Sequence, residues 1–284
     1  MFRNIYYNLV AAYIGFMALA ITLNAHVTSD VIDVVLTIAT FTFAIFLAFS
    51  VSIQSNRLNN IRKLLRASDA HLLTLYLLSK QLGVATQSRC RKMIDELLVT
   101  QIDYKLHDIE YTTHKVVELQ QFVFSIKPKN ERQSTLFSSM ISSANDIMEG
   151  HKDLIHSVNN KVLPIEWGVL TVLSLVIWFC LYSLNDGTTF ALVVIPLLST
   201  AFLLLLLILR EMNSLRWQEK HWDWDPLISL FKELALKPYF PAPVFTEKRL
   251  TKKDIKEIGP YRVATYPKPY PDFTGKKVKT IKQK

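Results

Sequence analysis

The chain has 284 residues, of which 50% are hydrophobic, and a formal net charge of +9 from 33 Lys and Arg against 24 Asp and Glu. A chain that is both this apolar and this basic separates the two kinds of residue along its length. Such a charge can indicate nucleic acid, but beside long apolar runs it reflects the excess of Lys and Arg on the cytoplasmic side of a membrane, so we expect no nucleic-acid partner. Cys90 and Cys180 lie in dissimilar stretches, which predicts neither a disulfide nor a metal-binding pair.

Two apolar runs open the chain, at residues 9–23 and 31–53. Each is close to the roughly 20 residues that a helix needs to cross a bilayer, so we expect residues 1–53 to form an N-terminal transmembrane hairpin. An alternative for the first run is a cleaved signal peptide, with Arg3 before the apolar core and a cut after Ala25. In either case the chain enters the membrane at the second run.

A second pair of apolar runs, at residues 163–184 and 189–209, is separated only by the turn Asn185-Asp186-Gly187-Thr188. This spacing predicts a second transmembrane hairpin over residues 163–210. None of the four runs carries Lys, Arg, Asp or Glu deep inside it. That argues against a proton-coupled transporter or a voltage sensor, but it is compatible with an anion pore lined by backbone and hydroxyl groups.

The fourth apolar run contains a proline in its middle. Pro196 predicts a kink, and the hydroxyl residues Ser199 and Thr200 follow it directly. Glu166 suits the N-terminus of the third span through the helix dipole, and its functional alternative is the cytoplasmic mouth of a pore. Our candidate pore or kink residues are therefore Pro196, Ser199, Thr200 and Glu166.

The distribution of basic residues predicts the orientation. The short loops at residues 26–30 and 185–188 carry no Lys or Arg, whereas residues 57–161 and the chain after Arg210 are rich in both. The positive-inside bias therefore places both termini and the central segment in the cytoplasm. We expect a multi-pass protein of the bacterial inner membrane with four spans.

The central segment, residues 54–162, is predicted to be a cytoplasmic helical bundle. Its first helix continues the second span to residue 82, its second covers residues 87–126, and its third covers residues 133–162. The chain leaves the membrane before this segment and returns to it afterwards. Three helices perpendicular to the membrane would end at the side of the bundle that is far from the membrane, so one helix must lie across the bundle or the long second helix must break. An intermolecular coiled coil is the alternative, because a heptad row does not identify its partner. The row consists of Ile102, Ile109, Val116 and Val123.

The tail, residues 211–284, is rich in Trp, Pro and Lys. We interpret Trp167, Trp217, Trp222 and Trp224 as an interfacial belt, with an aromatic ligand cage as the alternative for the last three. A short helix is expected to start at Asp225-Pro226, and residues 266–271 are predicted to form a polyproline spacer or a ligand for a proline-binding domain. Attraction to anionic lipid is one interpretation of the basic terminus, and a solvated tail is the other. Its lysines are Lys276, Lys277, Lys279, Lys282 and Lys284.

The order of these elements resembles that of the bestrophin-like membrane proteins, which include a prokaryotic branch of unknown function. The likeness rests on the first pair of spans, the long helical segment and the motif Leu163-Pro164-x-x-Trp167 that opens the second pair, and it covers residues 8–215. It implies a channel-like homo-oligomer, and no site residue is carried over from the family.

We therefore predict an all-α, four-span membrane protein with a long helical cytoplasmic segment between spans 2 and 3. Two functions remain open: an oligomeric anion channel, or a membrane-anchored scaffold or sensor whose cytoplasmic helices bind a protein. The sequence holds no nucleophile elbow, phosphate loop or pair of acids at motif spacing, so we expect neither an enzyme nor a cofactor.

Overall fold

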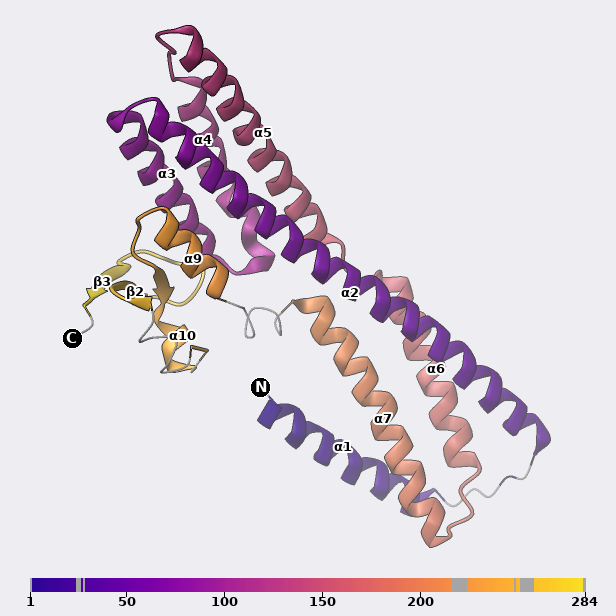
Figure 1. The fold of residues 1–284 in the computed structure, drawn as a ribbon. Coiled ribbons are helices and arrows are strands. Elements are labelled where there is room, and N and C mark those ends of the chain that lie inside the picture. The colour runs from indigo at the N-terminus through magenta and orange to yellow at the C-terminus, as the bar shows by residue number, and fades with distance from the viewer. Residues whose placement is uncertain are drawn as a thin grey trace. The chain divides into compact units, whose positions relative to one another are not determined.

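The computed structural model describes residues 2–23, 27, 29–215, 224–247, 249–250 and 258–282, with side chains from residue 7 onward. The chain divides into two compact units. We call Met1–Asn56 with Lys161–Arg216 the hairpin unit, and Arg57–Asn160 with Trp217–Lys284 the bundle unit. The two predicted hairpins thus share one unit, and the central segment shares the other with the tail. Helix α2 (Asp30–Gln81) begins in the first and ends in the second (Figure 1).

The remaining helices of the hairpin unit follow the apolar runs. α6 begins at Pro164, whose missing N–H is harmless in the first helical turn. α7 is capped by the Thr188 side chain, which accepts a hydrogen bond from the backbone N–H of Ala191 at 3.3 Å. These helices are α1 (Phe2–Thr22), α6 (Pro164–Ser183) and α7 (Thr189–Ser214).

Three stretches in the described part of the chain are long and apolar enough to cross a membrane, which confirms a membrane protein and falls short of the four predicted spans. They lie in α2, in Glu131–Ser183, whose apolar part is α6, and in α7. In α1 only the shorter stretch Tyr7–Thr22 is apolar.

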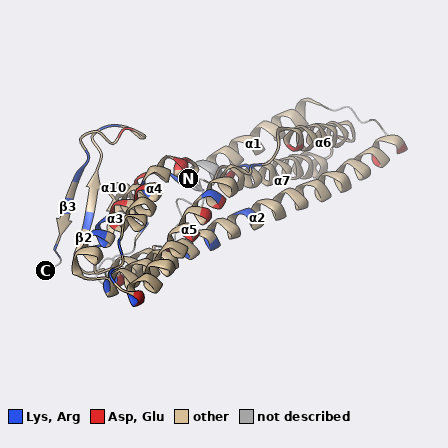
Figure 2. Cartoon of the chain, turned by 90° about the horizontal axis from the view of Figure 1, so that it is seen from above, with Lys and Arg blue, Asp and Glu red and all other residues tan. Residues whose placement is uncertain are grey.

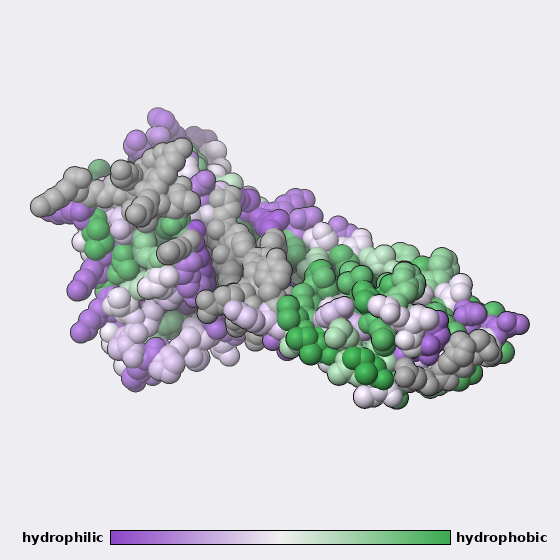
Figure 3. Space-filling view, turned by 90° about the horizontal axis from the view of Figure 1, so that it is seen from below, coloured by the Kyte–Doolittle hydropathy of each residue, from purple (hydrophilic) through white to green (hydrophobic). Residues whose placement is uncertain are grey.

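The hairpin unit has an apolar core and an apolar surface. Phe43 of α2, Leu170 of α6 and Leu209 of α7 are each at most 1% exposed and belong to one cluster. The Phe43 and Phe202 rings meet edge to face with centroids 5.2 Å apart. Large hydrophobic side chains also cover much of the outer face, and charged residues are sparse along these helices (Figures 2 and 3).

The C-terminal end of α1 is held by polar side chains of the second hairpin. The amide of Asn185, fully buried, donates to the carbonyl oxygens of Ala20 and Leu23 at 2.7 and 2.9 Å. The Tyr182 hydroxyl donates to the carbonyl of Phe16 at 2.9 Å. The two bonds from Asn185 satisfy carbonyl groups that the end of a helix leaves without partners, and the bond from Tyr182 holds the preceding turns of α1.

The helical part of the bundle unit packs around one apolar core. Leu72 and Leu75 of α2, Leu97 of α3 and Met140 of α5 are all completely buried in it. Of the heptad row, Ile109, Val116 and Val123 are at most 3% exposed within this single chain, so the row faces partners in its own bundle. The helices are α3 (Val84–Asp103), the 3₁₀ helix η1 (Leu106–Thr112), α4 (Thr113–Phe124) and α5 (Glu131–Asn159).

The prediction of one continuous helix over residues 87–126 is wrong. α3 ends at Asp103, and Tyr104 and Lys105 adopt extended backbone conformations before η1 begins. Neither residue is a helix breaker, so sequence alone gives no stop signal here. A return of the chain to the membrane requires either a helix that lies across the bundle or a break in the long second helix. The structure has the break.

The prediction of an all-α fold is wrong in the tail, although the protein is mostly helical. Strand β2 lies between β1, which is parallel to it, and β3, which is antiparallel to it. β2 buries Tyr261 and Ala264, whereas every residue of β3 is exposed. The tail consists of α9 (Asp225–Glu233), β1 (Tyr239–Pro241), α10 (Ala242–Thr246), β2 (Tyr261–Thr265) and β3 (Lys277–Ile281).

Candidate functional site

The predicted pore or kink residues do not form one site. Pro196 and Ser199 are buried in α7, and the Thr200 hydroxyl donates to the Pro196 carbonyl at 2.7 Å. Glu166 lies half-buried in the first turn of α6, at the opposite end of the hairpin. Pro196 and Ser199 are buried within this single chain, and a role of these four residues in a pore or a kink stays a prediction.

The predicted tryptophan belt is only partly within the described residues. Trp167 is half-buried against the hairpin core, at the start of α6. Trp224 is 8% exposed and packs in the bundle unit, with its ring centroid 5.4 Å from that of Phe240. The folded tail covers Trp224 within this single chain, and its place in an interfacial belt stays a prediction. Trp217 and Trp222 lie outside the described residues.

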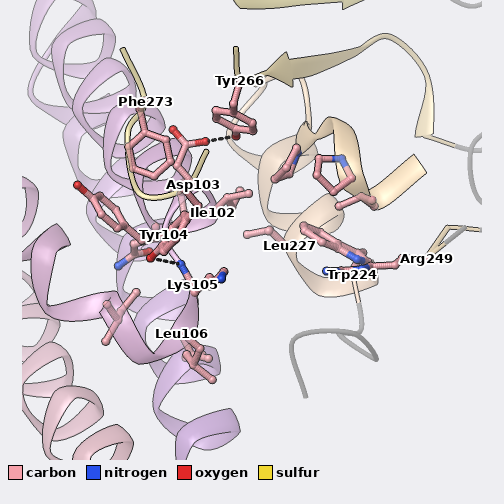
Figure 4. Close-up of a pocket in the computed structure, with 18 of the residues that line it drawn as sticks. Ile102, Asp103, Tyr104, Lys105, Leu106, Trp224, Leu227, Arg249, Tyr266 and Phe273 are labelled. Carbon is pink, nitrogen blue, oxygen red and sulfur yellow. Dashed lines mark hydrogen bonds between the residues drawn. The ribbon is translucent and has the colours of Figure 1, made fainter. Parts of the chain in front are cut away.

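The bundle unit contains a cavity of about 870 Å³. Its walls come from α2, from the junction of α3 and η1, and from the tail (Figure 4). The apolar part of the lining includes Leu98, Ile102, Leu106, Leu227 and Val244. The charged part comprises Arg62, Arg66, Asp69, Asp103, Lys105, Arg249, Lys268 and Asp272, and the aromatic part comprises Tyr104, Trp224, Tyr266, Tyr270 and Phe273.

The carboxylate of Asp103, the last residue of α3, joins the tail to the bundle. Its Oδ1 accepts from the hydroxyls of Tyr239 and Tyr266, at 2.5 and 2.6 Å, and its Oδ2 pairs with the ammonium of Lys276. The Asp103 side chain is 7% exposed. A carboxylate this buried is tolerated because three donors replace its water. The bond to Tyr266 is drawn in Figure 4.

The two tyrosines of this network remain protonated donors. Burial and the neighbouring Asp103 carboxylate raise the pKa of both the Tyr239 and the Tyr266 hydroxyl well above the usual value. The network is therefore a structural anchor and not a source of nucleophilic phenolate near neutral pH.

A second anchor lies two turns earlier on α3. The Arg262 guanidinium of β2 makes a bidentate pair with the Asp95 carboxylate, at 2.7 and 2.5 Å. The same guanidinium lies 5.7 Å from the ring centroids of Phe231 and Tyr239. Both groups of the ion pair are about one-fifth exposed, so water screens the pair only in part.

A third contact holds the loop between β2 and β3 on the α3–η1 junction. The Tyr270 hydroxyl donates to the Asp108 carboxylate and accepts from the Lys105 backbone N–H at 3.3 Å. The Lys105 ammonium lies 4.4 Å from the Tyr270 ring centroid, and the Phe273 ring meets that of Tyr104 edge to face at 4.9 Å. The predicted free spacer is therefore a docked aromatic loop.

The terminal lysines differ from one another. Lys276 pairs with Asp103, and its ammonium lies 4.9 Å from the Tyr239 ring centroid, so this charge is engaged within the bundle unit and its contact with lipid stays a prediction. Lys277 and Lys279 are exposed on β3, Lys282 is exposed just after it, and Lys284 lies outside the described residues. The signal for this strand in the sequence is its content of β-branched residues, Val278, Thr280 and Ile281, which favour a strand.

The ionisable side chains of the cavity include one carboxyl with a strongly shifted pKa. Burial raises the pKa of the Asp69 carboxyl to about 7, partly opposed by Arg66, so this group exchanges a proton near neutral pH. Its charged neighbours are mostly cationic, with Arg62, Arg66 and Lys105 exposed at the rim. Within the described ranges, no group of three His, Cys, Asp or Glu is placed to hold a metal ion.

Comparison with known proteins gives one finding. The model of the bestrophin-like domain family matches residues 6–214, which is most of the chain and ends before the tail. No match was found among curated proteins or among solved structures. Because the family model covers both apolar hairpins and the central helices, the chain belongs to the bestrophin-like family.

Proposed function

We propose that this protein is a subunit of an oligomeric membrane channel that passes small anions. The observation that carries the proposal is the incomplete burial of its apolar helices. In each of the three candidate spans, only 22% of the most apolar window is buried within one copy. The rest requires lipid or further copies, and Phe41, Phe179 and Phe190 are among the most exposed side chains.

Family membership and charge support the same proposal. The bestrophin-like family is channel-like, and the apolar runs lack the charged side chains that a proton-coupled carrier would need. An anion can instead be carried past hydroxyl, backbone and apolar groups. A single copy offers few helices to enclose a pore, so the channel is proposed to form between copies.

The proposed topology has four spans, with both termini in the cytoplasm of a bacterium. Its support for α1 is the pair of polar contacts from Asn185 and Tyr182, which bind the end of this helix to the second hairpin. A cleaved leader has no need of such a partner. In this topology the exposed Lys277, Lys279 and Lys282 are proposed to attract anionic lipid at the cytoplasmic surface of the membrane.

The proposal is tested by measuring chloride flux through the protein and the mass of its oligomer. The purified full-length protein should form a closed oligomer in detergent, measured by light scattering, and should release chloride from proteoliposomes. Protein-free liposomes and gluconate-loaded proteoliposomes are the controls. A monomer that leaves the liposomes tight to chloride would show that the proposal is wrong.

A second function is favoured by the cavity of the bundle unit. A membrane-anchored sensor or scaffold needs a folded binding domain, and the bundle with its docked tail provides one. A stoichiometric complex of the full chain with one soluble protein, together with tight proteoliposomes, would favour this function over the channel.

A further inference from the structure

We infer that the cavity of the bundle unit is a binding site for a small amphipathic organic anion, a molecule with an apolar or aromatic body and one carboxylate or phosphate group. This inference is independent of the proposed channel, because it concerns binding to the bundle unit and not flux. The cavity volume of about 870 Å³ lies within the range of sites that enclose small ligands.

The inner lining fits the body of such a ligand. Leu98 and Leu106 are at most 9% exposed, and Ile102 and Leu227 lie on facing walls (Figure 4). Burial of an apolar body here is favourable by about 25 cal/mol for each Å² removed from water. The rings of Tyr266 and Phe273 add flat surfaces at one end.

The charges fit the anionic group. Five cationic side chains line the cavity, against three carboxylates. Of the carboxylates, Asp103 is neutralised by Lys276, and Asp272 pairs with Lys268 at 2.9 Å. Of the cations, Arg249 pairs with Glu247 at 2.6 Å, so the charge offered to the ligand comes from Arg62, Arg66 and Lys105. The third, Asp69, is partly protonated near neutral pH because burial raises its pKa. The cations come from separate segments that line the same cavity, with Arg66 on α2 and Lys105 between α3 and η1.

An unsatisfied donor lies in the same wall. The indole N–H of Trp224 is buried and has no hydrogen-bond partner within the described part of the chain. Trp224 is 8% exposed and lines the cavity. A buried donor without a partner is costly, and an acceptor on the ligand would satisfy it.

The tail supplies half of this site and lies outside the family match. The match ends at residue 214, whereas Trp224, Leu227 and Tyr266 come from beyond it. Three anchors, at Asp95, Asp103 and Asp108, hold this segment against α3 and η1. The site is thus a property of the complete chain, not of the family domain alone.

Binding is measured on the full-length protein in nanodiscs by saturation-transfer NMR and calorimetry, with empty nanodiscs as the blank. The probes are 2-naphthoate, octanoate and AMP, compared with the uncharged 2-naphthamide, octanamide and adenosine. We expect saturable binding of at least one anion, at least about tenfold tighter than its uncharged partner, because a charged hydrogen bond is worth about 1.5–3 kcal/mol. A preference for octanoate assigns a membrane-derived ligand, and a preference for AMP assigns a soluble one.

Two variants test the place of binding. Lys105→Gln and Arg66→Gln should each weaken binding of the anion about tenfold, and should leave binding of the uncharged partner unchanged. Lys63→Gln, which removes an exposed cation of α2 outside the cavity, is the matched control and should have no effect. The circular dichroism melt of each variant verifies its fold.

Three results would overturn the inference. The first is no saturable binding of any of the three anions. The second is equal affinity for anions and their uncharged partners. The third is binding that both cavity variants leave unchanged while they melt as the parent does.

Discussion

The hairpin unit and the bundle unit are stabilised in different ways. In the hairpin unit, apolar side chains form the core and the outer surface, and Asn185 is the main polar link between distant segments. In the bundle unit, an apolar core is joined to the tail by buried or half-buried charges at Asp95, Asp103 and Asp108. Apolar packing tolerates small shifts, whereas a buried carboxylate requires particular donors at particular places. Disruption of one polar group should therefore cost more in the bundle unit.

The largest effect is expected at Asp103. Replacement of Asp103 by Ala leaves the Lys276 ammonium and two tyrosine hydroxyls without their acceptor, which should destabilise the docked tail by about 3–5 kcal/mol. Hydrogen exchange of residues 261–281 in the full-length protein measures this loss. Exposed Asp153→Ala is the control and should change exchange little. Equal protection in both variants would refute the anchor.

The next effect concerns His151, a buried residue of the bundle core. Its Nε2 lies 3.0 Å from the Thr113 hydroxyl, and burial lowers its pKa from 6.5 to about 4. Between these values the unfolded chain binds a proton that the folded chain does not, so the free energy of unfolding falls as the pH falls below 6.5. The fall should be about 2 kcal/mol between pH 7 and pH 5.

The measurement is chemical unfolding of the parent and of His151→Gln at both pH values. The variant should lose this part of the pH dependence while retaining the part due to other groups. Identical slopes in the two proteins would mean that the His151 imidazole is not buried as a neutral group.

A smaller effect is expected in the hairpin unit. Asn185→Ala removes two hydrogen bonds to carbonyls at the end of α1, which should cost about 1–3 kcal/mol. The change is measured by thermal unfolding in detergent, with Thr189→Ala, at an exposed residue that follows the same turn, as the control. The mass of the purified protein shows where its N-terminus lies. An N-terminus after residue 25 would contradict both this prediction and the retention of α1.

The smallest effect is expected at Thr200. Thr200→Val keeps the shape and removes only the hydroxyl that bonds to the Pro196 carbonyl, within the same helix. A loss of less than about 1 kcal/mol is expected, because the carbonyl has another lone pair and the helix continues on both sides. A loss of stability as large as that expected for Asp103→Ala would contradict the expectation that disruption of a polar group costs more in the bundle unit than in the hairpin unit. Thermal unfolding under the conditions used for Asn185→Ala measures it.

The predictable part of the fold depends on local signals. Apolar runs identify the hairpins, and Gly83, with φ of 117°, ends the long α2 as its sequence indicates. The break at Tyr104 and Lys105 has no local cause. Tyr270, far along the chain, contacts both Lys105 and Asp108 and holds the chain in this shape. Long-range contacts of this kind leave no periodicity in a sequence.

The candidate site was largely beyond prediction for the same reason. Its lining combines α2, the α3–η1 junction and the tail, which are distant in sequence. The tail itself gave a misleading signal, because its tyrosines and prolines are typical of an extended spacer. Trp224 lines the cavity, and the aromatic ligand cage, the alternative to the membrane interface for this residue, stays a prediction.

Asp103 also has a consequence for related sequences. This residue lies inside the part of the chain that matches the family, whereas Tyr239, Tyr266 and Lys276 lie beyond it. A relative that carries a similar tail needs an acceptor for these three donors at the end of its third helix. A relative without the tail has no use for a buried acid there, and an apolar or small residue would serve it better. The identity of this one residue can therefore indicate, from sequence alone, which relatives dock a tail in this way.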